Sequence, residues 1–182
     1  GTHYVELAAY YMIIDDTIVR RTNTAGEDYY VNGGKTLHRG LEVTLVSHWT
    51  DEWSTGIAYS HSKHNYDDDE NYGDNEQANA PNDLANVRIH YRPGWAPGLT
   101  SMLEWQYVDS WWMDDANKYE YDGYDLWNLK FSYNLSESVD LYAKIDNLTD
   151  EVYAERATYS WGKEKYTPGG PRQFYLGVET RW

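Results

Sequence analysis

Regular alternation of apolar and polar residues recurs along this chain, and it limits the folds that the chain can adopt. Within residues 99–107, Leu103 and Trp105 occupy one set of alternate positions, while Glu104 and Gln106 occupy the other. Successive side chains of a β-strand point to opposite faces, so a period of two predicts strands rather than helices. The same alternation occurs in residues 139–146 and 172–182, and similar runs start near residues 4, 35, 53, 83 and 123. We therefore predict an all-β, antiparallel chain of about eight strands.

The connections between these runs are of two kinds. Short turns are expected at residues 49–53, 92–98 and 134–138. Longer polar segments occupy residues 21–28, 66–81, 113–122 and 154–169. Tight turns at one end and long loops at the other are typical of an up-and-down outer-membrane β-barrel, in which the turns are periplasmic and the loops extracellular.

Each predicted strand has one apolar and one polar face. Leu41, Val87 and Leu129 are on the apolar side, and each is followed by a polar residue of the opposite face. In a transmembrane barrel these faces would meet lipid and a wet lumen, whereas in a soluble β-sandwich they would meet a dry core and water. Aromatic residues near strand ends, strands of about ten residues and the unequal connections favour the transmembrane barrel. No run approaches the roughly 18 consecutive apolar residues of a spanning helix.

Composition and motifs exclude several other classes of function. The chain has no cysteine, so it has neither disulfides nor thiol chemistry, and its net charge of -15 argues against a nucleic-acid partner. It contains no Gly-x-Ser-x-Gly elbow, no His-Glu-x-x-His and no phosphate-binding glycine loop. We therefore predict that it is not an enzyme and has no catalytic residues, and we expect no cofactor.

Two polar clusters are candidates for cation binding. The acidic segment 67–76 is read either as a solvated loop or as a ligand-gating or cation-binding loop, and it lacks the glycine and the glutamate of an EF-hand. His61 and His64 are the closest pair of histidines near it. An odd separation on a strand places them on opposite faces, so they are not expected to share one ion, and no metal site is predicted.

Several motifs, in a fixed order along the chain, resemble the barrel of TonB-dependent outer-membrane receptors. They are YYMIIDDTIVRR at 10–21, the Gly-Lys-x-x-x-Arg-Gly-x-Glu pattern at 34–42, APNDLANVRIHY at 80–91 and KIDNLTDEVYAERATYSWGKEKYTPGGPRQFYLGVETRW at 144–182. The segments 153–156 and 166–172 are most similar to the branch that takes up ferric siderophores and ferric citrate-like chelates.

The resemblance implies a barrel of about 22 strands with a plugged lumen. Residues 1–182 would be the C-terminal part of that transmembrane barrel, and the plug, the TonB box and the earlier strands would be absent from them. The implied function is active uptake of an iron chelate at the bacterial outer membrane, to which this part contributes barrel wall and extracellular gating loops. The implied partners are the ferric chelate, outer-membrane lipid and lipopolysaccharide, the TonB complex through the absent plug, and the barrel assembly machinery. In this family the last strand serves as a signal for the assembly machinery. The residues of that signal would here be Phe174, Leu176, Val178 and Trp182.

For an anionic ferric chelate we expect arginine and aromatic side chains at the loops and upper lumen, because a guanidinium group binds a carboxylate with two hydrogen bonds. The candidate ligand-binding residues are Arg20, Arg21, Arg39, Tyr72, Tyr119, Arg156 and Trp161. Alternatively, eight strands could close by themselves as a small outer-membrane barrel with an adhesion, structural or lipid-modifying role.

Overall fold

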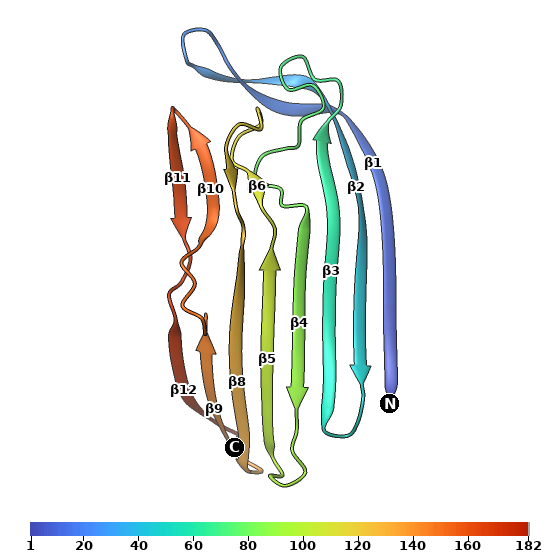
Figure 1. Cartoon of the computed structure of the whole chain (residues 1–182), viewed down its shortest axis with the longest axis vertical. Coiled ribbons are helices and arrows are strands. Elements are labelled where there is room, and N and C mark those ends of the chain that lie inside the picture. The colour runs from blue at the N-terminus through green and yellow to red at the C-terminus, as the bar shows by residue number, and fades with distance from the viewer. Residues whose placement is uncertain (182) are drawn as a thin grey trace.

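The computed structural model describes residues 1–181, apart from the side chains of residues 20, 22, 28, 32 and 33, and its regular structure is entirely β. Eight antiparallel strands form one sheet in the order β1-β2-β3-β4-β5-β8-β9-β12 (Figure 1). They are β1 (Thr2–Thr22), β2 (Asp28–His48), β3 (Trp53–Tyr66), β4 (Asp83–Tyr91), β5 (Leu99–Val108), β8 (Tyr124–Ser136), β9 (Val139–Asp146) and β12 (Gln173–Thr180). The all-β prediction is confirmed. Within residues 1–181 there is no helix long and apolar enough to cross a membrane.

The connections follow the predicted alternation. The three short turns lie together at one end of the sheet, and the long connections lie at the other end (Figure 1). We call these the turn end and the loop end. One expectation was wrong, since residues 154–168 are mostly a β-hairpin formed by β10 (Ala154–Ser160) and β11 (Lys163–Pro168). The two-residue turn between them has positive φ at both Trp161 and Gly162, which is the turn geometry that matches the twist of a hairpin. A second small pair joins β6 (Trp111–Trp112) to β7 (Glu120–Tyr121).

The first two strands extend beyond the rest of the sheet. Each has 21 residues, about twice the 9–11 that cross a membrane in a barrel. Their pairing is interrupted by register shifts between Ile14 and Ile18, where Asp16 has a positive φ of 59°. Such a bulge bends the strand that contains it. Past this bulge the β1–β2 hairpin leans across the loop end of the sheet (Figure 1).

The register aligns apolar positions of neighbouring strands into rows across one face. One such row consists of Val5, Leu45, Ile57, Val87, Trp105 and Trp127. The predicted separation of an apolar and a polar face is confirmed. The eight strands form a single layer, so the apolar face is not the dry interior of a sandwich (Figure 1).

The opposite face carries a connected polar network. Glu104 on β5 accepts hydrogen bonds from Asn86 Nδ2 at 3.0 Å, Arg88 Nε at 2.7 Å and Asn128 Nδ2 at 3.0 Å. Asn128 in turn accepts a bond from the backbone N–H of Asn147 at 2.9 Å. Because a buried carboxylate is costly without partners, this network ties β4, β5 and β8 together and fixes their register.

The sheet does not close on itself. β1 and β12 are the two ends of the strand order and are not paired with each other. The described residues therefore form an open, partial barrel wall, and not the closed eight-stranded barrel of the alternative interpretation.

Candidate functional site

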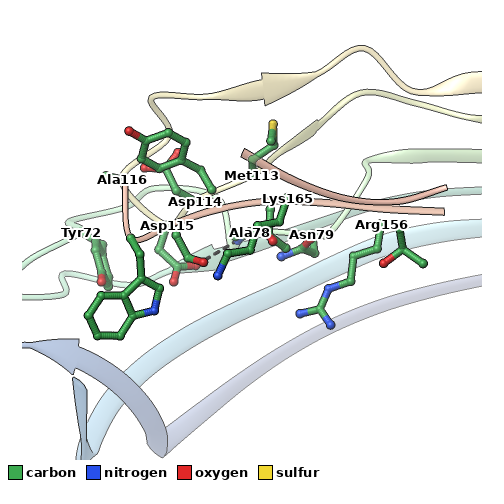
Figure 2. Close-up of a pocket in the computed structure, with 14 residues that line it drawn as sticks. Tyr72, Ala78, Asn79, Met113, Asp114, Asp115, Ala116, Arg156 and Lys165 are labelled. Atoms are coloured by element: carbon green, nitrogen blue, oxygen red, sulfur yellow. Dashed lines mark hydrogen bonds between the residues drawn. The ribbon is translucent and has the colours of Figure 1, made fainter. Parts of the chain in front are cut away.

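A pocket of about 620 Å³ lies at the loop end of the sheet (Figure 2). Three segments far apart in the sequence line it. They are the β3–β4 connection with Tyr72, the β5–β8 connection with Asp114 and Asp115, and the β10–β11 hairpin with Arg156 and Lys165. This volume is within the range of about 300–1,000 Å³ that holds small-molecule ligands.

The β10–β11 hairpin turns one of its faces toward the pocket. Arg156 is paired in register with Thr167, and Thr158 with Lys165, so these four side chains alternate along one face and all line the pocket. Among the described residues neither Arg156 nor Lys165 has a carboxylate partner. The hairpin thus presents two positive charges that are available to a ligand.

The two acidic residues of the pocket stabilise the loops that carry them. Asp114 Oδ1 accepts hydrogen bonds from the backbone N–H groups of Lys118 and Tyr119, both at 3.0 Å. Asp115 Oδ1 accepts one from the backbone N–H of Ala78 at 3.0 Å, which joins the β5–β8 connection to the β3–β4 connection. These hydrogen bonds let Asp114 and Asp115 shape one wall of the pocket, and neither carboxylate forms an ion pair with Arg156 or Lys165.

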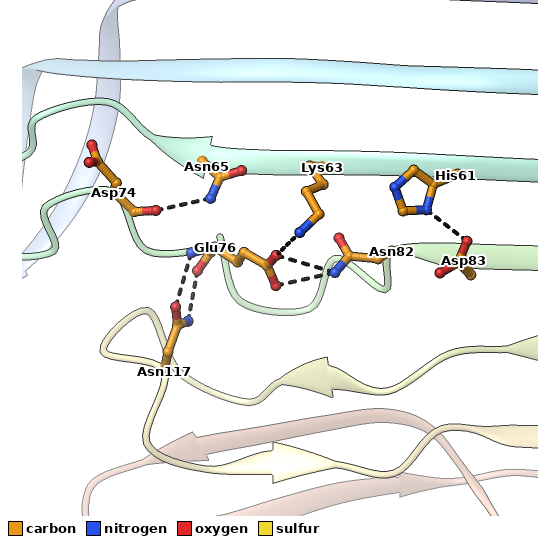
Figure 3. Close-up of polar contacts among 8 residues, drawn as sticks. All are labelled: His61, Lys63, Asn65, Asp74, Glu76, Asn82, Asp83 and Asn117. Atoms are coloured by element: carbon orange, nitrogen blue, oxygen red, sulfur yellow. Dashed lines mark hydrogen bonds and ion pairs between the residues drawn. The ribbon is translucent and has the colours of Figure 1, made fainter.

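A second set of contacts holds the β3–β4 connection in place (Figure 3). The Glu76 carboxylate accepts hydrogen bonds from Lys63 Nζ at 3.3 Å and from Asn82 Nδ2 at 3.2 Å. The backbone of Glu76 is bound on both sides by the Asn117 amide, at 3.0 and 2.9 Å. Part of the acidic segment 67–76 is therefore ordered by partners rather than simply solvated.

Aromatic packing anchors the hairpin against the β5–β8 connection. Trp111 and Met113 form a small buried cluster with Ala157, and Trp111 Nε1 donates a hydrogen bond to the Ala157 carbonyl at 3.1 Å. The rings of Tyr119 and Tyr159 stack with centroids 3.6 Å apart and planes 11° apart. These contacts fix the distance between the cationic hairpin face and the opposite wall of the pocket.

The bent β1–β2 hairpin reaches the same region through a buried ion pair. Arg21 donates to both Asp69 oxygens, with distances of 2.9 and 2.6 Å, and its guanidinium carbon lies 5.2 Å from the centre of the Tyr72 ring. Burial of Asp69 opposes its ionisation. Hydrogen bonds from Arg21 and from the backbone N–H groups of Asn71 and Tyr72 outweigh this and hold the pKa of the Asp69 carboxyl below its ordinary value. Because Tyr72 lines the pocket, this ion pair connects the hairpin tip to one wall of the site.

The structure brings together only some of the predicted ligand-binding residues. Tyr72, Arg156 and Trp161 line the pocket, Tyr119 stacks beside it, and Arg21 contacts Tyr72 from the side of the hairpin tip. Arg39 pairs with Tyr11 and Lys63 and shares alternate positions with Leu41, so it lies on the apolar face and away from this pocket. The side chain of Arg20 lies outside the described part of the chain.

Sequence reasoning missed Lys165 and Asp115. The signal for Lys165 was the Trp161-Gly162 turn, which would have predicted a hairpin and its pairing with Thr158. Of the predicted assembly residues, Phe174, Leu176 and Val178 lie exposed on the apolar face, and Trp182 lies outside the described residues.

The predicted separation of the two nearby histidines is confirmed. His61 Nδ1 is 2.8 Å from Asp83 Oδ1, whereas His64 lies on the other face and is the direct partner of His38 on β2. Among the side chains that the structure describes, no group of three or more His, Asp or Glu residues could enclose a metal ion.

Residues 1–148 match the sequence profile of a family described as TonB dependent receptor-like, beta-barrel. The ferrioxamine receptor of Yersinia enterocolitica is 27% identical over 178 residues, covering 91% of this chain and 24% of that protein. The probable TonB-dependent siderophore receptor PiuA of Acinetobacter baumannii is 27% identical over 140 residues, covering 70% of this chain and 19% of that protein.

Solved structures show the same fold. The ferric yersiniabactin uptake receptor FyuA from Yersinia pestis superposes with a TM-score of 0.83 at 16% identity, over 98% of this chain and 27% of that one. The ferric citrate transporter FecA in its unliganded form superposes with a TM-score of 0.81 at 20% identity, over 98% of this chain and 29% of that one. The chain thus spans about a quarter of the length of these relatives.

Proposed function

The chain belongs to the TonB-dependent receptor β-barrel family, as its ordered motifs predicted, and from this we propose that it is the C-terminal part of the barrel of a receptor that imports a ferric chelate. Members of this family are outer-membrane receptors that transport their ligands, and they are not enzymes. The prediction that the chain is not an enzyme is thereby confirmed.

In such a receptor each face of the sheet has its own environment. The apolar face contacts the lipid and lipopolysaccharide of the bacterial outer membrane, and the face that carries the Glu104 network lines the lumen. The earlier strands, the plug and the TonB box belong to the rest of the receptor, through which the TonB complex acts. Phe174, Leu176 and Val178 on the last strand contribute to recognition by the barrel assembly machinery.

The observation that carries the proposal is the pair of cations on the hairpin face. In a chain with 30 acidic and 15 basic residues, Arg156 and Lys165 lack carboxylate partners and point into a pocket with aromatic walls. A ferric chelate presents oxygen donors that carry partial or full negative charge around a bulky, partly apolar body. Charged hydrogen bonds from the hairpin and contacts with Tyr72, Tyr159 and Trp161 match those two features.

Binding and uptake measurements with variants of the hairpin test this proposal. The complete receptor is expressed in a strain that lacks its own copy, and growth under iron limitation is scored with ferrioxamine B or ferric citrate as the only iron source. Binding of the same chelates to the purified receptor is measured by tryptophan fluorescence. Each charged hydrogen bond contributes about 1.5–3 kcal/mol, so Arg156→Ala and Lys165→Ala are each expected to weaken binding by roughly 10–150-fold.

Lys118→Ala is the matched control, because Lys118 is an exposed cation at the same loop end that does not line the pocket. It is expected to bind and transport like the wild type. Unchanged binding in both hairpin variants would remove the pocket from the proposal. Failure of every ferric chelate to bind or support growth would refute the proposed function itself.

A further inference from the structure

Two histidines face each other on the polar wall below the pocket. His38 on β2 and His64 on β3 are direct cross-strand partners, on the same face as Glu42. Their Nδ1 atoms are 2.7 Å apart, and their ring centroids are 4.9 Å apart with the planes inclined at 54°. His38 also places its Nε2 atom 2.9 Å from Thr36 Oγ1. Both rings are half-buried and can be reached from the lumen side.

This arrangement directs two nitrogen atoms at one point. In a hydrogen bond between two neutral imidazoles, one Nδ1 carries the proton and the other offers its lone pair. If the ring that carries its proton on Nδ1 moves that proton to its own Nε2 atom, both Nδ1 lone pairs point at the same position. The total number of protons is unchanged. The contact with Thr36 keeps the His38 ring in this orientation, as outer partners of metal-binding histidines do.

We propose that His38 and His64 form a binding site for a divalent transition-metal ion such as Cu²⁺, Ni²⁺ or Zn²⁺, with one Nδ1 ligand from each ring. A metal with bonds of about 2.0–2.1 Å to each nitrogen requires the two nitrogens to lie about 2.9–3.4 Å apart at ordinary bond angles. The 2.7 Å separation needs to open by only a few tenths of an ångström, which small rotations of the two rings supply.

The chemistry of the pair selects the class of ion. Imidazole nitrogens suit copper, nickel and zinc, and among divalent ions Cu²⁺ binds most strongly to such a site. A hard ferric ion already enclosed by the oxygens of a chelate does not need these ligands. Among the described side chains, no histidine or carboxylate joins the pair to make a group of three metal ligands. The other coordination positions therefore go to water or to groups of an incoming ligand. The site is therefore open and weaker than an enclosed structural site.

The position of the pair relates it to the pocket. Tyr66 is paired with Thr36, one same-face position from the His38–His64 pair toward the loop end. Its ring packs at 5.0 Å from that of Tyr72, which lines the pocket. The histidine pair therefore lies on the same strands as Tyr66, one same-face position further from the loop end.

Copper titration of the complete receptor in detergent tests the site. The receptor is purified through a tag that contains no histidine, and Cu²⁺ alone is added while the electron paramagnetic resonance spectrum is recorded. The wild type is expected to bind one equivalent of Cu²⁺ through nitrogen ligands. The spectrum of this bound Cu²⁺ is expected to be absent from the variants. Loss of an outer partner alone costs about 10–100-fold in metal affinity, so His38→Ala and His64→Ala are each expected to lose at least that much.

His61→Ala is the matched control, because His61 is on the same strand but on the opposite face, beside Asp83. It should retain the wild-type spectrum and affinity. The mobility of the unheated receptor in gels shows whether a variant is folded. If an alanine variant does not fold, His38→Gln and His64→Gln replace it in the titration. Equal Cu²⁺ binding in the wild type and in both His38 and His64 variants would overturn the inference. Because no chelate is used, this result is independent of the proposed uptake function.

Discussion

The ion pair between Arg21 and Asp69 predicts how the bent β1–β2 hairpin is held over the loop end. The pair has two hydrogen bonds, and the side chains of Arg21 and Asp69 keep only 9% and 1% of their exposure to solvent. Asp69→Asn removes one charge with almost no change of shape. It leaves the Arg21 guanidinium buried beside a neutral amide that can no longer accept both bonds.

The magnitude follows from this burial. Removing one member of a buried ion pair costs about 3–5 kcal/mol, because the remaining charge is left without a partner. The hairpin tip can open locally and return Arg21 to water without unfolding the sheet, so the lower value applies to its opening. About 3 kcal/mol corresponds to an increase of roughly 150-fold in the population of the open hairpin tip.

Hydrogen exchange of the backbone amides of residues 17–34 measures this opening. Asp67→Asn in the same loop is the control, since Asp67 pairs with Lys35 at 2.7 Å with 34% and 46% of the side chains exposed. Exposed pairs contribute little, so this variant should exchange at nearly the wild-type rate. If the two variants accelerate exchange equally, burial of the Arg21–Asp69 pair is not what holds the hairpin tip.

Two further predictions concern acid and the hairpin turn. Because the folded-state pKa of Asp69 is below its ordinary value, the ion pair contributes fully above about pH 4 and is lost only as the pH falls below that. The distance between spin labels on the β1–β2 tip and on the β3–β4 connection should therefore stay constant from pH 8 to 5, and a change within that range would contradict this assignment. Gly162→Ala should destabilise the β10–β11 hairpin by about 1 kcal/mol, since φ is +71° there and an added Cβ meets no neighbour within 4 Å. Amide exchange of residues 154–168 should then rise about fivefold, and an unchanged rate would show that the turn is not under this constraint.

Most of the sheet could be predicted because each strand shows its own alternation of apolar and polar residues in the local sequence. In β5 the alternation of Leu103, Glu104 and Trp105 directly predicts which side chains lie on the apolar face and which lie on the polar face. The β10–β11 hairpin was missed because its strands, AERATYS and KEKYTP, have few apolar residues and no regular apolar alternation, which resembles a loop. The bend of the β1–β2 hairpin depends on the left-handed conformation of Asp16. A single aspartate in the sequence does not predict that conformation.

The candidate site was predictable only as a set of residue types near the loop end. Arg39 and Arg156 have the same chemistry, and only the register of β2 and of the β10–β11 hairpin decides that one joins the apolar face and the other lines the pocket. Lys165 depends in the same way on its pairing with Thr158. The His38–His64 pair joins residues 26 positions apart in the sequence, and only the pairing of β2 with β3 reveals it.

The distribution of charge partners explains why the two cations of the hairpin matter. Carboxylates outnumber cations two to one, and Arg21, Lys63 and Arg88 each have a carboxylate within hydrogen-bond distance. An anionic ligand approaching such a chain is repelled at long range, so it can gain only from cations that it reaches at short range and that no carboxylate already neutralises. Arg156 and Lys165 meet both conditions, because they line the pocket and the aromatic stack of Tyr119 on Tyr159 keeps their hairpin against its opposite wall. If the pocket takes the ferric chelate proposed above, chelates of small net charge should bind better than highly charged ones, since each additional negative charge adds long-range repulsion without a further unpaired cation among the described residues of the pocket.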